Sequence, residues 1–308
     1  MERALVTGVA GFIGCHLADA LHGAGCELIG VDDERSGDWS RLRVPCTEVR
    51  RDLATLTPAE LEDLCRDVDV VFHLAAEKHN AAKATPEKII DVNVAATRRL
   101  YEAAARTGRA KIVFTSSLYA YGNMGPEPMR ETDLPAPRTT YGASKLAGEH
   151  LLRVAYDDHR VPWSVARLFF IYGPRQFAEG GYKSVIVSNF ERLARGEAPT
   201  VYGDGEQALD YVYIDDAVAA LLALAAPEHD GKTLNIASGH GVTVNELTEA
   251  MLTAAGSHLS PRPCPPDWTA GSRRVGDPTA AARELGWKAD TPLHVGLTRC
   301  WEWTGARA

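Results

Sequence analysis

"TGVAGFIG" occupies residues 7–14, between the apolar run "RALV" and a stretch of helical apolar periodicity that begins at Phe12. It places Gly8, Gly11 and Gly14 in a GxxGxxG spacing. Glycine lets the backbone turn tightly and approach a pyrophosphate, whose charge is met by the amides of a helix N-terminus. The alternative is a strand-to-helix turn with incidental glycines, but the strand before the motif and the helix after it make it more specific. The stretch therefore predicts a dinucleotide-binding loop.

The acidic residue that ends the next strand predicts which dinucleotide binds. Asp32 stands eighteen residues after Gly14, in the strand-like run "ELIGVDD". A carboxylate at this point binds both hydroxyls of an adenosine ribose and repels a 2′-phosphate, which favours NAD over NADP. Asp33 follows and Arg35 stands close behind it, so the sequence alone leaves NADP open.

The first half of the chain alternates strand-like and helix-like segments. Apolar runs such as "VVFHLAA" (70–76) are typical of strands that are covered on both faces, and "VNVAATRRLYEAAARTG" (92–108) has a helical pattern. Repeated β-α-β units of this length predict an α/β fold with a parallel sheet. After about residue 170 Pro, Gly and aromatic residues become frequent, as is typical of segments that cap a sheet and shape a pocket.

Composition narrows the classes of partner. The 308-residue chain is 45% hydrophobic and 24% charged, as in an ordinary globular protein. Its formal charge of -8 disfavours a polyanion binder, so we expect no nucleic-acid partner. Six scattered cysteines without a CxxC pair, and an N-terminus without a leader pattern, predict reduced thiols and a cytoplasmic location. No run of about 18 apolar residues occurs, so no membrane span is expected, and we expect no metal site.

The segment "TTYGASK" (139–145) sets a phenol one helical turn from an ammonium. Tyr141 and Lys145 are four residues apart and therefore share a helix face. A nearby cation lowers the pKa of a phenol, so the pair is a candidate proton acceptor. A solvated surface helix that carries Tyr and Lys by chance is the alternative, because YxxxK alone is a common pattern.

Taken in order, TGxxGFxG, "HLAA" (73–76), "FTSS" (114–117), "YGASK" (141–145) and "YIDD" (213–216) resemble the extended short-chain dehydrogenase/reductase family, and most closely its nucleotide-sugar epimerases and dehydratases. The resemblance covers nearly all of the chain. It implies a doubly wound parallel sheet of the Rossmann type with a smaller C-terminal α/β substrate-binding domain. The implied NAD-binding domain comprises residues 1–168 plus about 206–226. The substrate-binding domain comprises about 169–205 plus 227–308.

The resemblance also implies a cofactor, a catalytic trio and an oligomer. The cofactor is NAD, and the trio is Ser117, Tyr141 and Lys145. Lys145 would hold the nicotinamide ribose and, together with the positive ring of the cofactor, keep Tyr141 as phenolate. Ser117 would hydrogen-bond the reacting oxygen and relay its proton. A homodimer through helices at about 91–106 and 141–157 is expected. The positions expected to bind the cofactor are Gly8, Gly11, Phe12, Ile13, Gly14, Asp32, Asp33, Asp52, Leu53, Leu74, Ala75, Ala76, Lys78, Asn93, Tyr141 and Lys145.

The residues beside the trio bear on the type of reaction. Members of the family that dehydrate their substrate carry an Asp-Glu pair where this chain has Leu118 and Tyr119, and decarboxylation relies on a glutamate there. Since leucine transfers no proton, epimerisation, which needs little beyond the trio, is the expected reaction. A dehydratase, a ketoreductase that consumes external NAD(P)H and a non-catalytic dinucleotide sensor are the alternatives. Glu77 and His79 are further ionisable candidates at the end of their strand, and His73 is expected to be a core residue.

The substrate half departs from the family pattern. An asparagine that meets the substrate diphosphate is replaced by Phe170, and an arginine by Leu209. Losing two such contacts weakens the binding of a diphosphate, so a nucleoside or another substrate without that group is one hypothesis. The other is that Lys183, Arg175 or the arginines around residue 273 supply the contacts. The expected substrate-binding residues are Glu77, Ser117, Leu118, Tyr119, Phe169, Phe170, Lys183 and Leu209.

Overall fold

The computed structural model describes residues 1–78, 85–108, 110–122, 128–176, 183–267 and 269–305. The chain forms two compact units. The first comprises Met1–Asn123, Glu131–Leu168 and Val218–Leu234, and the second comprises Met124–Arg130, Phe169–Ala217 and Asn235–Ala308.

Three segments fall on the other side of the expected domain division. Residues 128–130 belong to the second unit, where Met129 forms an isolated β-bridge with Gly276. Residues 206–217 belong to the second unit, because strand β9 (Ala208–Tyr213) pairs there with three other strands. Residues 227–234 belong to the first unit, because strand β10 (Lys232–Ile236) extends the large sheet beside β6 (Trp163–Leu168).

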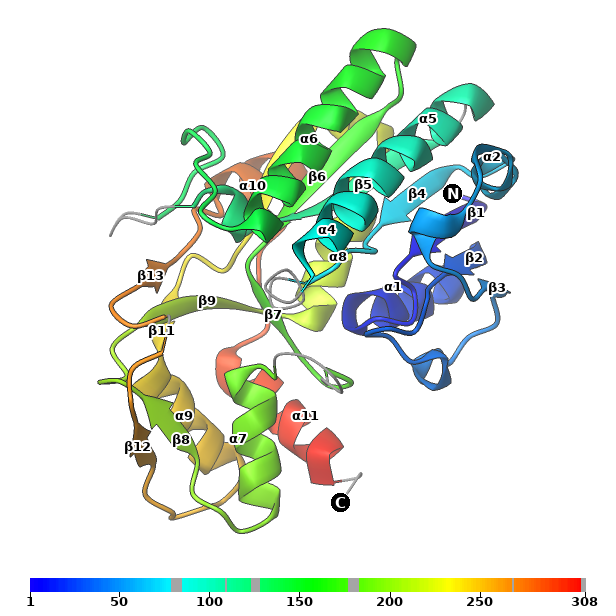
Figure 1. The fold of residues 1–308 in the computed structure, drawn as a ribbon. Coiled ribbons are helices and arrows are strands. Elements are labelled where there is room, and N and C mark those ends of the chain that lie inside the picture. Colours follow the sequence, from blue (N-terminus) through cyan, green and yellow to red (C-terminus); the bar gives the residue numbers. More distant parts are fainter. Residues whose placement is uncertain (79–84, 109, 123–127, 177–182, 268, 306–308) are drawn as a thin grey trace. The chain divides into compact units, whose positions relative to one another are not determined.

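The first unit contains a seven-stranded sheet in the order β10-β6-β5-β4-β1-β2-β3 (Figure 1). The pairs from β3 across to β6 are parallel. The chain moves outward from β1 in one direction and returns at β4 to move in the other. In doubly wound sheets, ligands bind at the carboxyl ends of the strands on either side of such a switch point, which here are β1 and β4. The predicted doubly wound α/β fold is confirmed. Its remaining strands are β1 (Arg3–Thr7), β2 (Glu27–Val31), β3 (Thr47–Val49), β4 (Val70–His73) and β5 (Lys111–Ser117).

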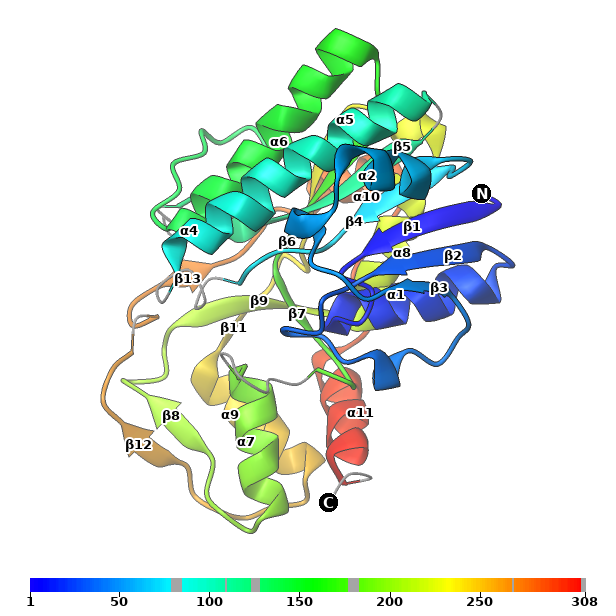
Figure 2. The same ribbon diagram turned by 45° about the vertical axis from the view of Figure 1, so that its right-hand side comes forward.

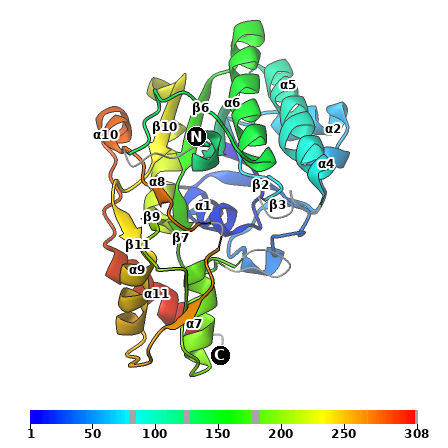
Figure 3. The same ribbon diagram turned by 60° about the vertical axis from the view of Figure 1, so that its left-hand side comes forward.

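Helices cover both faces of this sheet. Figure 3 shows α2, α4, α5 and α6 on one side and α1 on the other, and α5 and α6 run side by side (Figures 1 and 2). Helix α2 is capped at its N-terminus, where Thr57 and Glu60 form a capping box. The elements are α1 (Phe12–Gly23), η1 (Trp39–Arg41), η2 (Leu53–Thr55), α2 (Pro58–Cys65), α4 (Pro86–Ile89), the π-helical η3 (Ile90–Ala96), α5 (Thr97–Thr107), η4 (Leu118–Ala120), α6 (Thr140–His159), α8 (Ile214–Leu224) and η5 (Pro227–His229).

A hydrophobic core fills the space between the sheet and helices α2, α5 and α6. Leu5 and Phe114 reach it from the strands, and Leu100, Tyr101 and Leu152 reach it from the helices. All five side chains are almost completely buried. Burial of this apolar surface is the main favourable contribution to the free energy of folding. It holds in place the carboxyl ends of the strands, where the candidate site lies.

The second unit has smaller sheets and its own helices. Strand β9 pairs with β7 (Phe170–Tyr172), β11 (Gly241–Thr243) and β13 (Arg273–Arg274), while β8 (Thr200–Tyr202) pairs with β12 (Arg262–Cys264). Helices α7, α9 and α11 pack against one another (Figure 1). The helices are α7 (Val185–Ala194), α9 (Val244–Ala254), α10 (Thr279–Leu285) and α11 (Leu293–Gly305). In the part of the chain that the structure describes, every helix is too short or too polar to span a lipid bilayer.

Candidate active site

The glycine loop lies between β1 and α1 and leaves no room for side chains. Gly8 has a φ of +75°, and a Cβ atom there would lie 2.8 Å from the backbone nitrogen of Ala75. At Gly14 a Cβ atom would lie 2.1 Å from the carbonyl oxygen of Gly8. Gly11 is the N-cap of α1, and no side chain caps the helix. The first-turn amides at Phe12 and Ile13 are therefore unobstructed by a capping side chain, and the loop fits a pyrophosphate.

Asp32 anchors this loop from the end of β2. Its carboxylate accepts a hydrogen bond from the backbone N–H of Ala10 at 3.0 Å and another from the N–H of Glu34 at 2.8 Å. Burial raises the pKa of Asp32, and these two backbone hydrogen bonds oppose the rise. The carboxylate is thus held at the rim of the glycine loop, where an adenosine ribose is expected.

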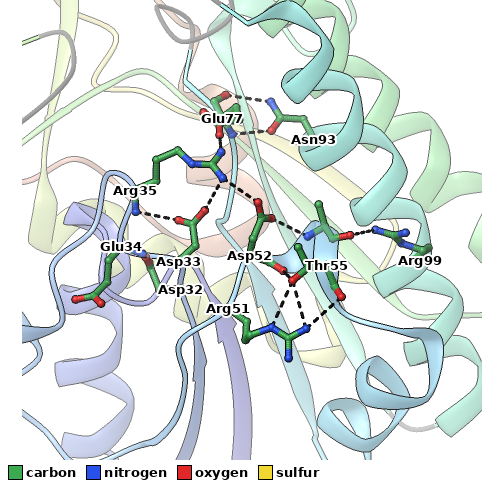
Figure 4. A network of polar contacts seen from close by, with 11 residues as sticks. Asp32, Asp33, Glu34, Arg35, Arg51, Asp52, Thr55, Glu77, Asn93 and Arg99 are labelled. Atoms are coloured by element: carbon green, nitrogen blue, oxygen red, sulfur yellow. Dashed lines mark hydrogen bonds and ion pairs between the residues drawn. The ribbon is translucent and has the colours of Figure 1, made fainter.

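Arg35 binds carboxylates that follow three different strands (Figure 4). Its guanidinium contacts Asp33 at 3.1 Å, Asp52 at 2.8 Å and the carboxylate of Glu77. A guanidinium that is already paired in this way offers little charge to a 2′-phosphate. The geometry around Arg35 therefore favours NAD, in agreement with the preference that Asp32 indicated in the sequence.

The loops after β3 and β4 carry the other expected cofactor positions. Asp52 caps η2 by accepting the N–H of Ala54 at 2.8 Å, and Leu53 is buried.

In the loop after β4, Leu74, Ala75 and Ala76 are partly buried, and Ala75 donates its N–H to the hydroxyl of Thr7. Lys78 is exposed and is the last described residue before a gap. His79 lies outside the described residues.

Asn93, in the π-helical η3, joins the loop after β4 to helix α6. Its side-chain oxygen accepts the N–H of Glu77 at 2.7 Å, and its Nδ2 donates to the carbonyl of Glu77 at 3.1 Å (Figure 4). The same Nδ2 donates to Ser144 Oγ at 3.0 Å. The side chain is 3% exposed. Asn93 therefore fixes protein segments, and a direct contact with the cofactor stays a prediction.

The predicted catalytic trio is brought together in the first unit. Ser117 ends β5, and its hydroxyl forms a hydrogen bond with the phenol of Tyr141 at the start of α6. Lys145 Nζ lies 5.9 Å from the centroid of the Tyr141 ring and donates to the carbonyl of Thr115 at 2.9 Å. A phenol, a hydroxyl and a buried amine thus converge at the carboxyl end of a central strand.

Burial shifts the pKa values of this group in opposite directions. Burial raises the pKa of Tyr141 to about 12, and the hydrogen bond with Ser117 only partly opposes the rise. Burial lowers the pKa of Lys145 to about 7, against the pull of the nearby Glu149 carboxylate. Burial therefore outweighs any effect of the lysine on the phenol, and the resemblance assigns the stabilisation of a phenolate to Lys145 together with the positive ring of the cofactor. A positive charge close to the phenol oxygen would lower the pKa of Tyr141.

The neighbouring residues of the trio differ in what they can contribute. Leu118 is 2% exposed and carries no proton. Tyr119 is partly exposed, and its ring meets that of Tyr141 edge-on with centroids 5.8 Å apart. Glu77 is buried and is paired with Arg35. His73 is completely buried between the hydroxyls of Thr7 and Thr97, which fits the expected core residue.

The other expected substrate residues belong to the second unit. Phe169 is buried and packs at Gly276. Phe170 is half-buried and lies opposite Tyr211 across β7 and β9, with ring centroids 6.0 Å apart. Leu209 is buried in β9. Lys183 is exposed and pairs with Glu191 at 2.7 Å, so its charge is already compensated.

The sequence interpretation missed a buried ion pair behind the trio. Arg167 of β6 holds the carboxylate of Glu149 with two hydrogen bonds of 2.9 and 2.7 Å, and Ser116 donates to the same carboxylate at 2.5 Å. Glu149 follows Lys145 by one helical turn, and this spacing was the available signal. The arginine on β6 had no local signal, because its proximity depends on the pairing of distant strands.

Comparison with known proteins gives a consistent result. The model of the "NAD dependent epimerase/dehydratase family" matches residues 4–237. The chain is 33% identical to a UDP-glucose 4-epimerase of Mycolicibacterium smegmatis over 96% of both chains. It is 32% identical to UDP-glucuronic acid decarboxylase 1 of Arabidopsis thaliana, over 96% of this chain and 68% of that protein. A crystal structure of UDP-glucose 4-epimerase from Thermotoga maritima with UDP-glucose superposes with a TM-score of 0.93, at 32% identity and over 99% of both chains. The chain belongs to the NAD-dependent epimerase/dehydratase family.

Proposed function

We propose that this protein epimerises a nucleotide sugar by transient oxidation of a secondary hydroxyl, with NAD bound and regenerated in place. The observation that carries the proposal is the convergence of Ser117, Tyr141 and Lys145 in the same unit as the glycine loop. The relatives are nucleotide-sugar epimerases and decarboxylases, which supports a substrate of that class.

The chain's own residues divide the work of this reaction. NAD, when bound, would accept a hydride from the substrate carbon and return it. Gly8 and Gly14 let the backbone approach its pyrophosphate, and Asp32 binds the adenosine ribose. Tyr141 takes the proton of the substrate hydroxyl and later returns it, while Ser117 donates a hydrogen bond to the same oxygen.

The residues after Ser117 favour epimerisation over elimination. Leu118 is buried and apolar where a dehydratase or a decarboxylase of the family would carry an acid. Epimerisation needs no further proton donor, because the keto form only has to turn and take the hydride back on its other face. A dehydratase in which Tyr119 protonates a leaving hydroxyl is the second candidate, supported by its ring contact with Tyr141.

Two arginines of the second unit are candidates for the diphosphate. Strand β13 runs beside β9 with Arg274 in register with Leu209 and Arg273 in register with Ala208. A cation on the neighbouring strand can replace the arginine that is absent from position 209. The aromatic pair Phe170–Tyr211 supports the rival hypothesis of a substrate without a diphosphate, because it offers a surface on which a base stacks.

Ligand binding separates these hypotheses. UDP-, dTDP- and GDP-sugars are compared with nucleosides for their effect on the melting temperature, and product is then detected by mass spectrometry without added cofactor. We expect stabilisation and turnover with a nucleotide sugar, at unchanged product mass. A loss of 18 mass units identifies the dehydratase. Stabilisation by nucleosides alone overturns the hypothesis that the substrate carries a diphosphate.

We further propose that the protein is a cytoplasmic homodimer. Helices η3–α5 and α6 cover the segments where the resemblance expects the dimer contact, and they expose Ile90 and Val154 to about half of their surface. Light scattering after size-exclusion chromatography tests this, with Val154→Glu expected to dissociate the dimer. A wild-type monomer would contradict it.

A further inference from the structure

The ion pair between Arg35 and Glu77 crosses the sheet edge at the point where the glycine loop begins. Arg35 stands four residues after the end of β2, and Glu77 stands four residues after the end of β4. Strand β1 lies between β2 and β4 in the sheet. Since β1 leads into the glycine loop, the pair links the two sides of the crevice in which a dinucleotide lies in folds of this kind.

The arginine is fixed on the adenosine side of that crevice. Its backbone N–H donates to Asp33 Oδ1 at 3.0 Å, and its Nη2 lies 3.1 Å from Asp33 Oδ2 and 2.8 Å from Asp52 Oδ2. Both aspartates follow strands at the same end of the sheet, β2 and β3. The guanidinium is thus aimed across the crevice by two carboxylates and meets Glu77 with its other nitrogen (Figure 4).

The glutamate is fixed on the β4 side. The side chain of Glu77 is 8% exposed, against 35% for Arg35, so the pair is sheltered at one end. The backbone of Glu77 is held at both N–H and C=O by Asn93. Asn93 also donates to Ser144, whose hydroxyl donates to the carbonyl of Tyr141 at 2.8 Å. One end of the bridge is therefore tied to the start of the helix that carries the predicted proton acceptor.

We propose that Arg35 and Glu77 form a clasp that closes over bound NAD and slows its release. The inference rests on the proposed function, in which the cofactor stays in place between turnovers. Opening the clasp leaves the buried Glu77 carboxylate without its partner, which is costly, and an ion pair of this kind acts mainly on the dissociation rate. A contact between two exposed side chains would slow the release little, since exposed ion pairs contribute little free energy.

The test is a pulse-chase of radiolabelled NAD on the full-length protein. Labelled NAD is bound, excess unlabelled NAD is added, and the retained label is followed with time. The variants are Arg35→Gln, Glu77→Gln and the double variant. Arg51→Gln is the matched control, because this substitution removes the same charge from the segment after β3, next to Asp52. Arg51 contacts Glu60 and Thr55 instead of the clasp residues.

We expect each single variant to release NAD about tenfold faster than the wild type, and the control to match the wild type. The double variant should be no faster than the faster single one, because the two side chains act as one unit. Unchanged release in Arg35→Gln and Glu77→Gln, or faster association at unchanged release, overturns the clasp while leaving the proposed function intact. A wild type that binds no NAD overturns both. Melting curves of all variants exclude misfolding, and Arg35→Lys, which keeps the charge, should retain part of the slow release.

Discussion

The Nζ atom of Lys145 lies 5.9 Å from the ring centroid of Tyr141, one helical turn away on the same face of α6, and donates to the carbonyl of Thr115. The amine therefore lies beside the phenol but does not offset the effect of burial on the pKa of the phenol. Burial raises the pKa of Tyr141 to about 12 and lowers that of Lys145 to about 7. The site is organised to receive a positive charge before it can work as a base.

The phenol should thus titrate differently with and without cofactor. Ultraviolet difference titration of wild type minus Tyr141→Phe should show a phenol with a pKa near 12 in the cofactor-free protein. Addition of NAD should lower that value, because the oxidised nicotinamide brings a positive charge. An ordinary value near 10 in the cofactor-free protein would contradict the role given to burial.

Gly14 and Gly23 offer a matched pair on one helix. Gly14→Ala should destabilise the protein by about 2–4 kcal/mol and abolish NAD binding, because its Cβ atom would strike the Gly8 carbonyl. Gly23→Ala should be neutral or stabilising by up to about 1 kcal/mol, since no atom lies within 4 Å of the added carbon. Urea unfolding and NAD titration measure both effects. Equal stability of the two variants would show that the loop does not pack as described.

His73 should make the fold sensitive to acid. Burial lowers its pKa to about 3, below the usual 6.5 of the unfolded chain, so the unfolded state binds more protons between these values. Stability is full above pH 6.5 and is lost as the pH falls, by about 1.5 kcal/mol between pH 6.5 and pH 5. Denaturant unfolding at these two pH values should show this loss in the wild type and a smaller one in His73→Gln. Parallel losses in the two proteins would contradict a buried neutral histidine.

The carboxylates at the ends of β2 and β3 should make the protein bind NAD more tightly than NADP. We expect NAD to raise the melting temperature and NADP to do so only at concentrations about a hundredfold higher, because Asp32 and Asp33 repel a 2′-phosphate and Arg35 is already paired. Asp32→Ala should weaken NAD binding in the same assay. Equal stabilisation by both dinucleotides would refute this account of the adenosine end.

Much of the first unit was predictable because its signals are local. The glycine spacing at residues 8–14, the apolar strands and the cap of Thr57 each depend on neighbours in sequence, and the fold agrees with them. The side chains that complete the site come from distant segments. The pairing of Arg35 with Asp52 and Glu77, and of Arg167 with Glu149, depends on which strand ends lie side by side.

The second unit was less predictable for the same reason. Its strands are short, and their pairing decides which residues can substitute for one another. Position 209 carries leucine, and the register that sets Arg274 beside it joins residues 65 positions apart in the chain. The same pairing moves residues 206–217 out of the expected domain.

In the proposed reaction Tyr141 takes the proton of a sugar hydroxyl while a hydride leaves the same carbon, and both later return to the sugar. The most direct measurement follows a UDP-sugar deuterated at the epimerised carbon, incubated with purified protein and no added cofactor. We expect an epimer of unchanged mass that keeps its deuterium, with the rate reduced about a thousandfold in Tyr141→Phe and unchanged in Tyr156→Phe, whose ring is exposed further along the same helix. Loss of the deuterium to solvent, or full activity of Tyr141→Phe, would contradict the account.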